Sequence, residues 1–134
     1  MTSAFPTEVV DRLLLAVERG DVLATTCPSR AILQHLTNRW GTLIMLALSS
    51  GTLRFSDLRR RIGGVSERML AQTLQQLEAD GMVRRVAHNV VPPHVDYSLT
   101  PIGTEAALHV ANLVSWIETS LPRILAKGAR ADAA

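Results

Sequence analysis

The chain has little of what marks membrane, secreted and disulfide-stabilised proteins. It contains one cysteine, Cys27, so any disulfide would have to join two chains or a small thiol. No apolar run approaches the roughly 20 residues that a membrane-spanning helix needs. Acidic and basic residues interrupt the apolar stretch within residues 1–21, which is unlike a secretory signal peptide. We therefore expect a soluble protein that stays in the cytoplasm.

Groupings of residues that support catalysis are also missing from the sequence. It has no paired catalytic carboxylates, no phosphate-binding loop and no membrane-binding helix. The segment GVSER at 64–68 resembles a nucleophile elbow, but Arg68 replaces its last glycine and no strand precedes it, so Ser66 is better explained as a helix cap. His88, His94 and Asp96 could meet across a hairpin, but the histidines lack the spacing of metal ligands. We expect neither an enzyme nor a bound cofactor or metal.

The composition instead predicts one globular domain with an uneven charge. The 134 residues are enough for a single buried core, and the chain is 47% apolar and 19% charged. The formal net charge is only +2. Residues 53–85 hold seven arginines and four acidic residues, a net charge of +3, whereas the remainder carries −1. Arginine concentrated in one segment is expected of a surface that contacts phosphate groups.

Helical spacing of apolar residues predicts three scaffold helices before this segment. The first covers about 7–19, and the second begins at Pro28 and has an apolar face made by Ile32, Leu33 and Leu36. The third covers 38–50 and ends before Gly51. One side of this third helix is apolar, with Trp40, Leu43, Ile44, Ala47 and Leu48.

The arginine-rich segment predicts two further helices, separated by Gly63 and Gly64. The first, FSDLRRRI at 55–62, is capped by Ser56 and turns its arginines outward. Its buried residues are Phe55, Leu58 and Ile62. The second is capped by Ser66, runs to about Asp80 and stops at Gly81.

This second helix has an apolar side and a polar side. Leu70, Leu74 and Leu77 lie along one stripe. On a helical projection, the opposite side carries Arg68, Gln72, Gln75 and Gln76. That face is polar without being uniformly charged.

The periodicity changes from helical to alternating after Gly81. Residues 82–89 and 94–100 form two strands, joined by a bend at Asn89 and the proline pair 92–93. The second strand has Val95, Tyr97 and Leu99 on one face and Asp96 and Ser98 on the other. Thr100 then caps a long helix that starts at Pro101 and ends at about Leu121, before a tail that we expect to fray. The apolar stripe of this helix is wider than one small domain needs, which predicts contact with a second chain.

Together these elements predict a mainly α fold with a small β-hairpin, a winged helix-turn-helix. We assign a single domain over 1–134. Its parts are an N-terminal dimerisation helix within 1–26, a DNA-binding core at 27–100 with the wing at 82–99, and a C-terminal dimerisation helix at 101–125.

The polar helix suits DNA because the major groove admits one α-helix, whose exposed side chains reach base edges. Glutamine can pair with adenine and arginine with guanine, each good pair discriminating by about 1–3 kcal/mol. The predicted base-reading residues are Ser66, Arg68, Gln72, Gln75 and Gln76. The predicted phosphate and wing contacts are Arg54, Arg59, Arg60, Arg84, Arg85, His88, Asn89 and His94. Taken alone, either feature is more often a solvated surface than a DNA site, and the order of the two helices and the hairpin is what favours DNA. The alternative function is a winged-helix module that docks proteins and not DNA.

Residues 27–105 resemble the HxlR-type family of bacterial winged-helix transcriptional regulators, which are relatives of the MarR group. The resemblance rests on Cys-Pro at 27–28, Arg39-Trp40, RFSDLRRRI, SERML, LEADGMV and VDYSLTPIG in that order. It implies a homodimer joined by the terminal helices, with recognition helices at 66–76 and wings at 83–98 on a palindromic double-stranded DNA operator. We expect a repressor. The segments TNRWG and CPSR depart from the usual family pattern.

Cys27 precedes a predicted helix start, where the helix dipole and Arg30 would favour its thiolate. The resemblance implies that it senses oxidants or electrophiles, and the alternative is a partly buried structural thiol. Trp40 and Trp116 are assigned to core and dimer packing. A wedge between the terminal helices and the winged domain could hold a small effector.

Overall fold

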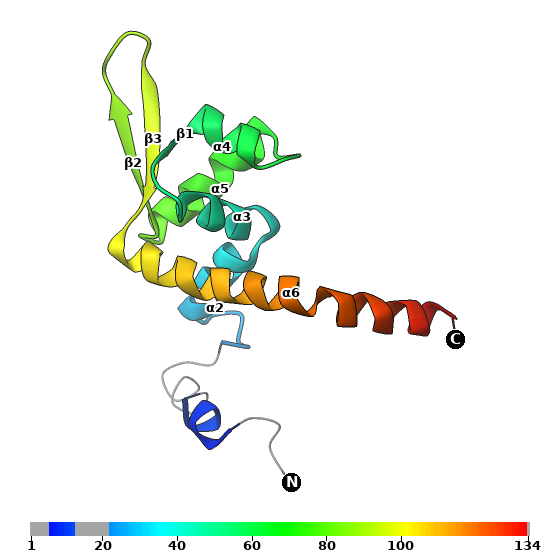
Figure 1. The fold of residues 1–134 in the computed structure, drawn as a ribbon. Coiled ribbons are helices and arrows are strands. Elements are labelled where there is room, and N and C mark those ends of the chain that lie inside the picture. The colour runs from blue at the N-terminus through cyan, green and yellow to red at the C-terminus, as the bar shows by residue number, and fades with distance from the viewer. Residues whose placement is uncertain (1–5, 13–21, 134) are drawn as a thin grey trace.

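The computed structural model of the chain describes residues 6–12 and 22–133, and its elements are arranged as a winged helix-turn-helix (Figure 1). Residues 7–12 are helical, and residues 13–19 of the predicted first helix lie outside the described part. The elements that follow are α2 (Pro28–Thr37), α3 (Arg39–Leu48), β1 (Leu53–Arg54), α4 (Phe55–Arg61), α5 (Glu67–Ala79), β2 (Val83–His88), β3 (His94–Leu99) and α6 (Pro101–Ala133). The hairpin of β2 and β3 projects from the body formed by the other helices, and the C-terminal half of α6 extends past that body.

Local signals determine where α2 and α3 begin. Pro28 occupies the first turn of α2, as predicted, where its missing N–H leaves no bond unmade. The Asn38 side chain caps α3 by accepting hydrogen bonds from the backbone N–H groups of Trp40 and Gly41. A Cβ added at Gly41 would lie 1.9 Å from the carbonyl oxygen of His35. The close approach of α3 to α2 therefore requires glycine at this position.

The caps of α4 and α5 differ from each other. The predicted cap of α4 by Ser56 is wrong, because α4 already begins at Phe55, its N-cap residue is Arg54 and no side chain caps it. Strand β1 ends at Arg54, directly before α4, so Ser56 is already inside the helix and its hydroxyl does not cap it. The predicted cap of α5 is confirmed, because the Ser66 hydroxyl accepts a hydrogen bond from the backbone N–H of Met69 at 3.1 Å.

The sheet has three antiparallel strands in the order β1-β3-β2. The predicted hairpin is confirmed, with Val83 opposite Leu99 and His88 opposite His94. The third strand, β1, was not predicted. It pairs Leu53 with Tyr97 and so attaches the segment before α4 to the far side of β3.

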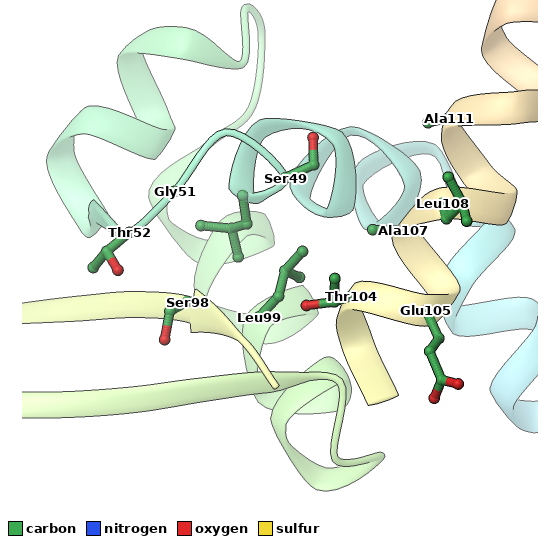
Figure 2. A pocket seen from close by; sticks show the side chains of 11 residues that line it. Ser49, Gly51, Thr52, Ser98, Leu99, Thr104, Glu105, Ala107, Leu108 and Ala111 are labelled. Carbon is green, nitrogen blue, oxygen red and sulfur yellow. The ribbon is translucent and has the colours of Figure 1, made fainter. Parts of the chain in front are cut away.

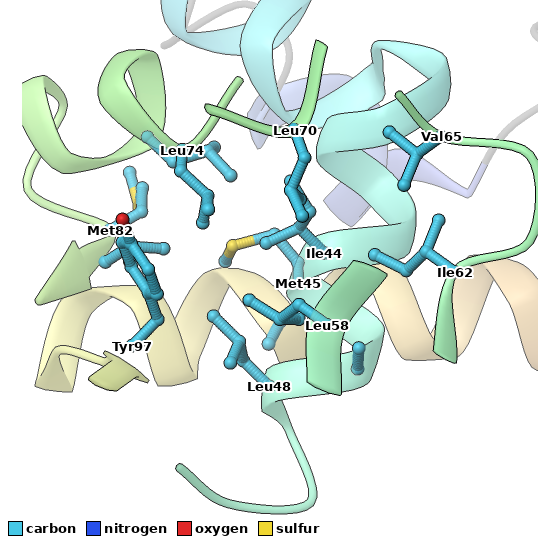
Figure 3. Close-up of a cluster of buried hydrophobic side chains, with 14 residues drawn as sticks. Ile44, Met45, Leu48, Leu58, Ile62, Val65, Leu70, Leu74, Met82 and Tyr97 are labelled. Carbon is cyan, nitrogen blue, oxygen red and sulfur yellow. The ribbon is translucent and has the colours of Figure 1, made fainter. Parts of the chain in front are cut away.

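The core lies where α3, α4, α5 and the inner side of the sheet meet (Figure 3). Its fully buried large side chains are Ile44, Met45, Leu58, Leu70, Leu74, Leu77, Val83 and Thr73. The predicted leucine stripe of α5 is therefore confirmed. The predicted face of α3 needs one correction, because Leu43 is exposed and Met45 is buried in its place. The core contacts α3 on the side that holds Ile44 and Leu48, and Met45 adjoins that side.

Helix α6 is longer than predicted. Thr100 caps it by accepting a hydrogen bond from the backbone N–H of Gly103 at 2.9 Å, as expected. The predicted end near Leu121 is wrong, because the helix continues past Pro122 to Ala133. The residues after Pro122 are mainly alanine, leucine, lysine and arginine, which favour helix strongly enough to continue beyond the proline. None of the helices within the described ranges is long and apolar enough to cross a membrane.

Candidate nucleic-acid interface

Helix α5 has one outward face made of three polar side chains. Arg68, Gln72 and Gln75 are all exposed and follow each other at helical spacing. The opposite side is anchored in the core by Leu70, Leu74 and Leu77, each at most 1% exposed. We call Arg68, Gln72 and Gln75 the reading face. Because its support is fully buried, the reading face keeps a fixed direction relative to the domain.

Two further predicted base-reading residues lie at the border of this face. The exposed Ser66 uses its hydroxyl as an acceptor for the helix cap. Gln76 is half-buried and lies one turn before Asp80, whose carboxylate is 2.5 Å from His35 of α2. Gln76 therefore lies at the edge of the reading face, next to Gln72 on the side of α5 that faces α2.

The three arginines of α4 have partners within the chain. Arg59 pairs with Glu67 of α5 at 2.9 Å, and Arg60 pairs with Asp57 one turn before it. Arg61 donates a hydrogen bond to the hydroxyl of Ser50 at 3.1 Å. Exposed ion pairs of this kind contribute only about 0–1 kcal/mol, so phosphate could replace the carboxylates of the first two. The Arg59–Glu67 pair links the basic helix α4 to the start of α5.

The wing, formed by β2 and β3, has two different faces. Residues paired across antiparallel strands share a face, and neighbours along a strand alternate. The inner face, toward the core, consists of Val83, Arg85, Ala87, Val95, Tyr97 and Leu99. The outer face consists of Arg84, Val86, His88, His94, Asp96 and Ser98, together with Arg54 of β1, which pairs in register with Asp96.

The predicted wing contacts are therefore divided between these faces. Arg85 lines a hollow of about 410 Å³ between the wing and α5, together with Gln75 and Glu78. Arg84 is on the outer face with His88 and His94, whose rings stack with centroids 4.6 Å apart. Arg85 is thus brought close to the reading face, and Arg84 is not.

The tip of the wing carries two apolar side chains that were not among the predicted contacts. Val90 and Val91, next to the exposed Asn89, are 52% and 99% exposed. Valine is unusual in a polar turn, so the two valines between Asn89 and the proline pair could have indicated a contact at this tip from the sequence. An apolar tip of this kind can enter the minor groove.

Comparison with known proteins shows which family this winged helix-turn-helix belongs to. The sequence model of the HxlR-like helix-turn-helix family matches residues 35–124. The chain belongs to that HxlR-like family. An uncharacterized HTH-type transcriptional regulator of Escherichia coli (strain K12), YtfH, is 59% identical over 110 residues, which are 82% of this chain and 87% of that protein.

Solved structures agree with the HxlR-like assignment. The transcriptional regulator YtfH from Salmonella typhimurium is 59% identical with a TM-score of 0.77, and the match covers 81% of this chain and 96% of that one. The redox regulator HypR in its reduced form is 31% identical with a TM-score of 0.68, over 74% of this chain and 98% of that one. The HxlR-like protein is a DNA-binding regulator of transcription, and its predicted winged-helix fold is confirmed.

A cavity of about 650 Å³ lies at the base of the wing in this HxlR-like protein (Figure 2). It is bounded by the end of α3, the end of β3 and the first turns of α6. Its walls are Leu48, Ser49, Gly51, Thr52, Ser98, Leu99, Thr104, Glu105, Ala107, Leu108 and Ala111. The volume is in the range of small-molecule sites. It corresponds to the predicted wedge between a terminal helix and the winged domain.

Cys27 is the N-cap residue of α2 and is buried, with 9% of its surface exposed. The Arg30 guanidinium donates a hydrogen bond to the carbonyl oxygen of Leu23 at 2.8 Å. The thiol therefore lies at a helix start, as predicted, while Arg30 is engaged with the backbone of the preceding segment.

Proposed function

We propose that the protein is a homodimeric repressor in the cytoplasm, in which α5 reads base pairs in the major groove of a palindromic operator. The observation that carries this proposal is the reading face: three exposed polar side chains on a helix whose other side is buried. Arg68 can pair with guanine, and Gln72 and Gln75 with adenine. A compact dimer on an operator would repress by excluding polymerase from the promoter.

The reading face is tested by selecting bound sequences from a random duplex library and then measuring affinity for the selected operator and its single-base variants. Arg68→Ala and Gln72→Ala should each relax preference at particular base pairs by about 1–3 kcal/mol. Gln34→Ala changes an exposed glutamine on α2 and serves as the matched control. Unchanged discrimination in both variants would refute the assignment. If the protein bound no duplex at all, a protein-docking role would replace it.

The arginines around α5 are proposed to contact phosphates. Their contribution is a salt-dependent affinity, with a log–log slope of about −0.9 for each phosphate neutralised. Replacing Arg54, Arg59 or Arg60 with alanine should weaken binding equally on all sequences and reduce that slope by about one. A flat salt dependence of the unmodified protein would contradict these contacts.

The two wing arginines should behave differently, because they lie on opposite faces. Arg85 shares a hollow with Gln75 beside the reading face, whereas Arg84 points to the outer face. We expect Arg85→Ala to weaken operator binding more than Arg84→Ala. Equal effects of the two changes at all salt concentrations would contradict this division of the wing contacts.

The homodimer is proposed from the exposed apolar side of α6. Six large apolar residues between positions 113 and 125 of this helix are at least 38% exposed: Leu113, Trp116, Ile117, Leu121, Ile124 and Leu125. A continuous apolar stripe of this length is expected to be covered by another chain. Two copies would place their reading helices about one turn of DNA, roughly 34–36 Å, apart. Operator half-sites with that spacing would support the dimer, and a single asymmetric site would contradict it.

We propose a thiol response at Cys27, for which the likeness to the redox regulator HypR gives support. Diamide would oxidise the Cys27 thiol and a glutathione thiol to one mixed disulfide and would itself be reduced to the hydrazine. The glutathionyl group does not fit at a buried helix start, so α2 would move. Because His35 of α2 is 2.5 Å from Asp80 at the end of α5, the displacement would reach the reading helix.

The thiol response is measured as operator affinity before and after diamide with glutathione. The unmodified protein should lose affinity, and dithiothreitol should restore it. Cys27→Ser should not respond. A response that persists in Cys27→Ser would exclude the thiol, since the chain has no other cysteine.

The cavity at the base of the wing is proposed as the effector site. Its largely aliphatic walls, with Thr104 and Glu105 at one side, suit a small molecule that is mostly apolar. A screen of small aromatic and aliphatic compounds for an increase in Tm would test it. Ala111→Trp narrows the cavity and should remove any such increase, and an increase that survives this change would place the site elsewhere.

A further inference from the structure

The outer face of the wing brings together three side chains that can bind a metal ion. His88 and His94 are directly opposite each other across the hairpin, and Asp96 follows His94 by two residues on the same face. His88 Nε2 is 2.8 Å from one Asp96 oxygen, and His94 Nε2 is 3.9 Å from the other. We expected no metal here from the sequence because the histidines lack the usual ligand spacing, and the register of the hairpin is what brings the three side chains together.

The separations between these atoms fit a small divalent ion. One ligand atom from each residue can be chosen so that all three lie within 4.8 Å of one another. Ligand atoms about 2.1 Å from a tetrahedral ion are about 3.4 Å apart. The distances of 2.8 and 3.9 Å, each to a different Asp96 oxygen, lie on either side of that value, so small side-chain rotations would complete the geometry.

The cluster is ordered but open to solvent. The side chains of His88, His94 and Asp96 are 39%, 24% and 27% exposed, and the strand backbone holds all three in position. Of the residues that the structure describes, only the two histidines pair with the Asp96 carboxylate, although Arg54 is its cross-strand neighbour. An ion could therefore reach the site and would find ligand atoms that are already gathered.

We propose that His88, His94 and Asp96 bind one divalent transition-metal ion of the zinc type, with water in the remaining position. Two imidazole nitrogens and one carboxylate oxygen favour zinc, cobalt, nickel or copper over magnesium and calcium, which prefer oxygen ligands only. The ion replaces the hydrogen bond between His88 and Asp96, and both imidazoles bind in their neutral form.

Metal binding would change the charge of the wing. The Asp96 carboxylate carries −1, and a divalent ion makes the group +1, next to Arg54 and Arg84 on the same face. Bound metal should then increase affinity for DNA, a consequence that rests on the proposed function. Metal binding itself does not rest on it.

The site is tested by titrating untagged full-length protein with Co²⁺ and following the visible absorbance, with Zn²⁺ as competitor. One Co²⁺ per chain should bind, and Zn²⁺ should displace it. His88→Ala and His94→Ala should each weaken binding at least about tenfold, and Asp96→Asn should weaken it less, because the amide keeps an oxygen that can still coordinate the ion, although more weakly than a carboxylate. His109→Ala changes an exposed histidine on α6 and should bind as the unmodified protein does.

Folding of the variants is checked by far-UV circular dichroism, and a second readout uses stability. Zn²⁺ should raise the Tm of the unmodified protein and of His109→Ala but not of the double variant His88→Ala/His94→Ala. Equal Co²⁺ affinity in the unmodified protein and the double variant, or no Co²⁺ binding at all, would overturn the site. Operator affinity is measured with and without Zn²⁺ in the same variants. A protein that binds DNA but no metal refutes the site alone, and one that binds metal but no DNA refutes the proposed function alone.

Discussion

Gly103 in the first turn of α6 provides a sharp test of how the terminal helix is attached to the winged domain. A Cβ at this position would lie 1.9 Å from the carbonyl oxygen of Met82 and 2.8 Å from its carbonyl carbon. That is roughly 1.5 Å short of van der Waals contact. The obstructing atoms belong to the backbone between α5 and β2, so they cannot rotate away as a flexible side chain could. Gly103→Ala therefore forces α6 and the wing apart.

The expected magnitude combines two opposing effects. Overpacking of this severity costs about 3 kcal/mol, at the upper end of the usual range. Alanine favours helix over glycine by about 1 kcal/mol. We expect Gly103→Ala to lower the free energy of unfolding by about 2 kcal/mol, measured by chemical denaturation followed by circular dichroism at one fixed protein concentration.

Gly128 on the same helix is the matched control. A Cβ there meets no atom within 4 Å, so Gly128→Ala should be neutral or stabilising by up to about 1 kcal/mol. The two variants make the same chemical change and differ only in what the new methyl group meets. A Gly103→Ala protein as stable as Gly128→Ala would refute the close contact between α6 and Met82.

Four further variants test the caps, the core and the dimer. Ser66→Ala should lower the free energy of unfolding by about 1 kcal/mol because it removes a cap, whereas Ser56→Ala should change it by less than about 0.5 kcal/mol; equal losses would contradict the capping assignment. Leu74→Ala, at a site only 1% exposed, should cost about 2–5 kcal/mol in chemical denaturation, and a loss below about 1 kcal/mol would mean that α5 is not anchored there. Trp116→Glu should shift sedimentation at micromolar concentration from dimer to monomer, and an unmodified chain that sediments as a monomer would contradict the proposed interface.

The elements that could be predicted from the sequence are those whose ends carry local signals. Helix α5 was placed to within a residue at each end, because Ser66 caps its start and Gly81, with a φ of +78°, suits the turn after it. The spacing of its leucines then fixes which side is buried. The reading face follows from these two local facts, and no long-range contact is needed to derive it.

Features that depend on distant pairing could not be predicted. Strand β1 is only two residues long and exists because Leu53 pairs with Tyr97, far away in the sequence. That pairing also explains the error at Ser56, because it places the backbone at the start of α4 without a capping side chain. The Arg59–Glu67 pair likewise depends on the angle between α4 and α5, which no local pattern encodes.

The separation of Arg84 from Arg85 is an intermediate case. Alternation along a strand places neighbours on opposite faces, so the sequence contained the information. Arg85 is the arginine on the core side, because it shares a strand face with Val83 and Tyr97, which are buried. That burial is known only once the sheet packs on the helices. The cluster of His88, His94 and Asp96 is also an intermediate case. Alternation predicts that His94 and Asp96 share a face, and the register of the hairpin places His88 opposite His94.

The scaffold helices are both attached at the same end of α5, which suggests how a change in the dimer could control DNA binding. Asp80 contacts His35 of α2, Thr100 donates a hydrogen bond to the carbonyl oxygen of Gly81, and Gly103 lies against Met82. The 13 residues of α5 extend about 20 Å from these attachments. A rotation of about 10° at that end would move Arg68, near the opposite end, by about 3 Å. Because a hydrogen bond tolerates only a few tenths of an ångström, so small a rearrangement of α2 or α6 is enough to break base contacts.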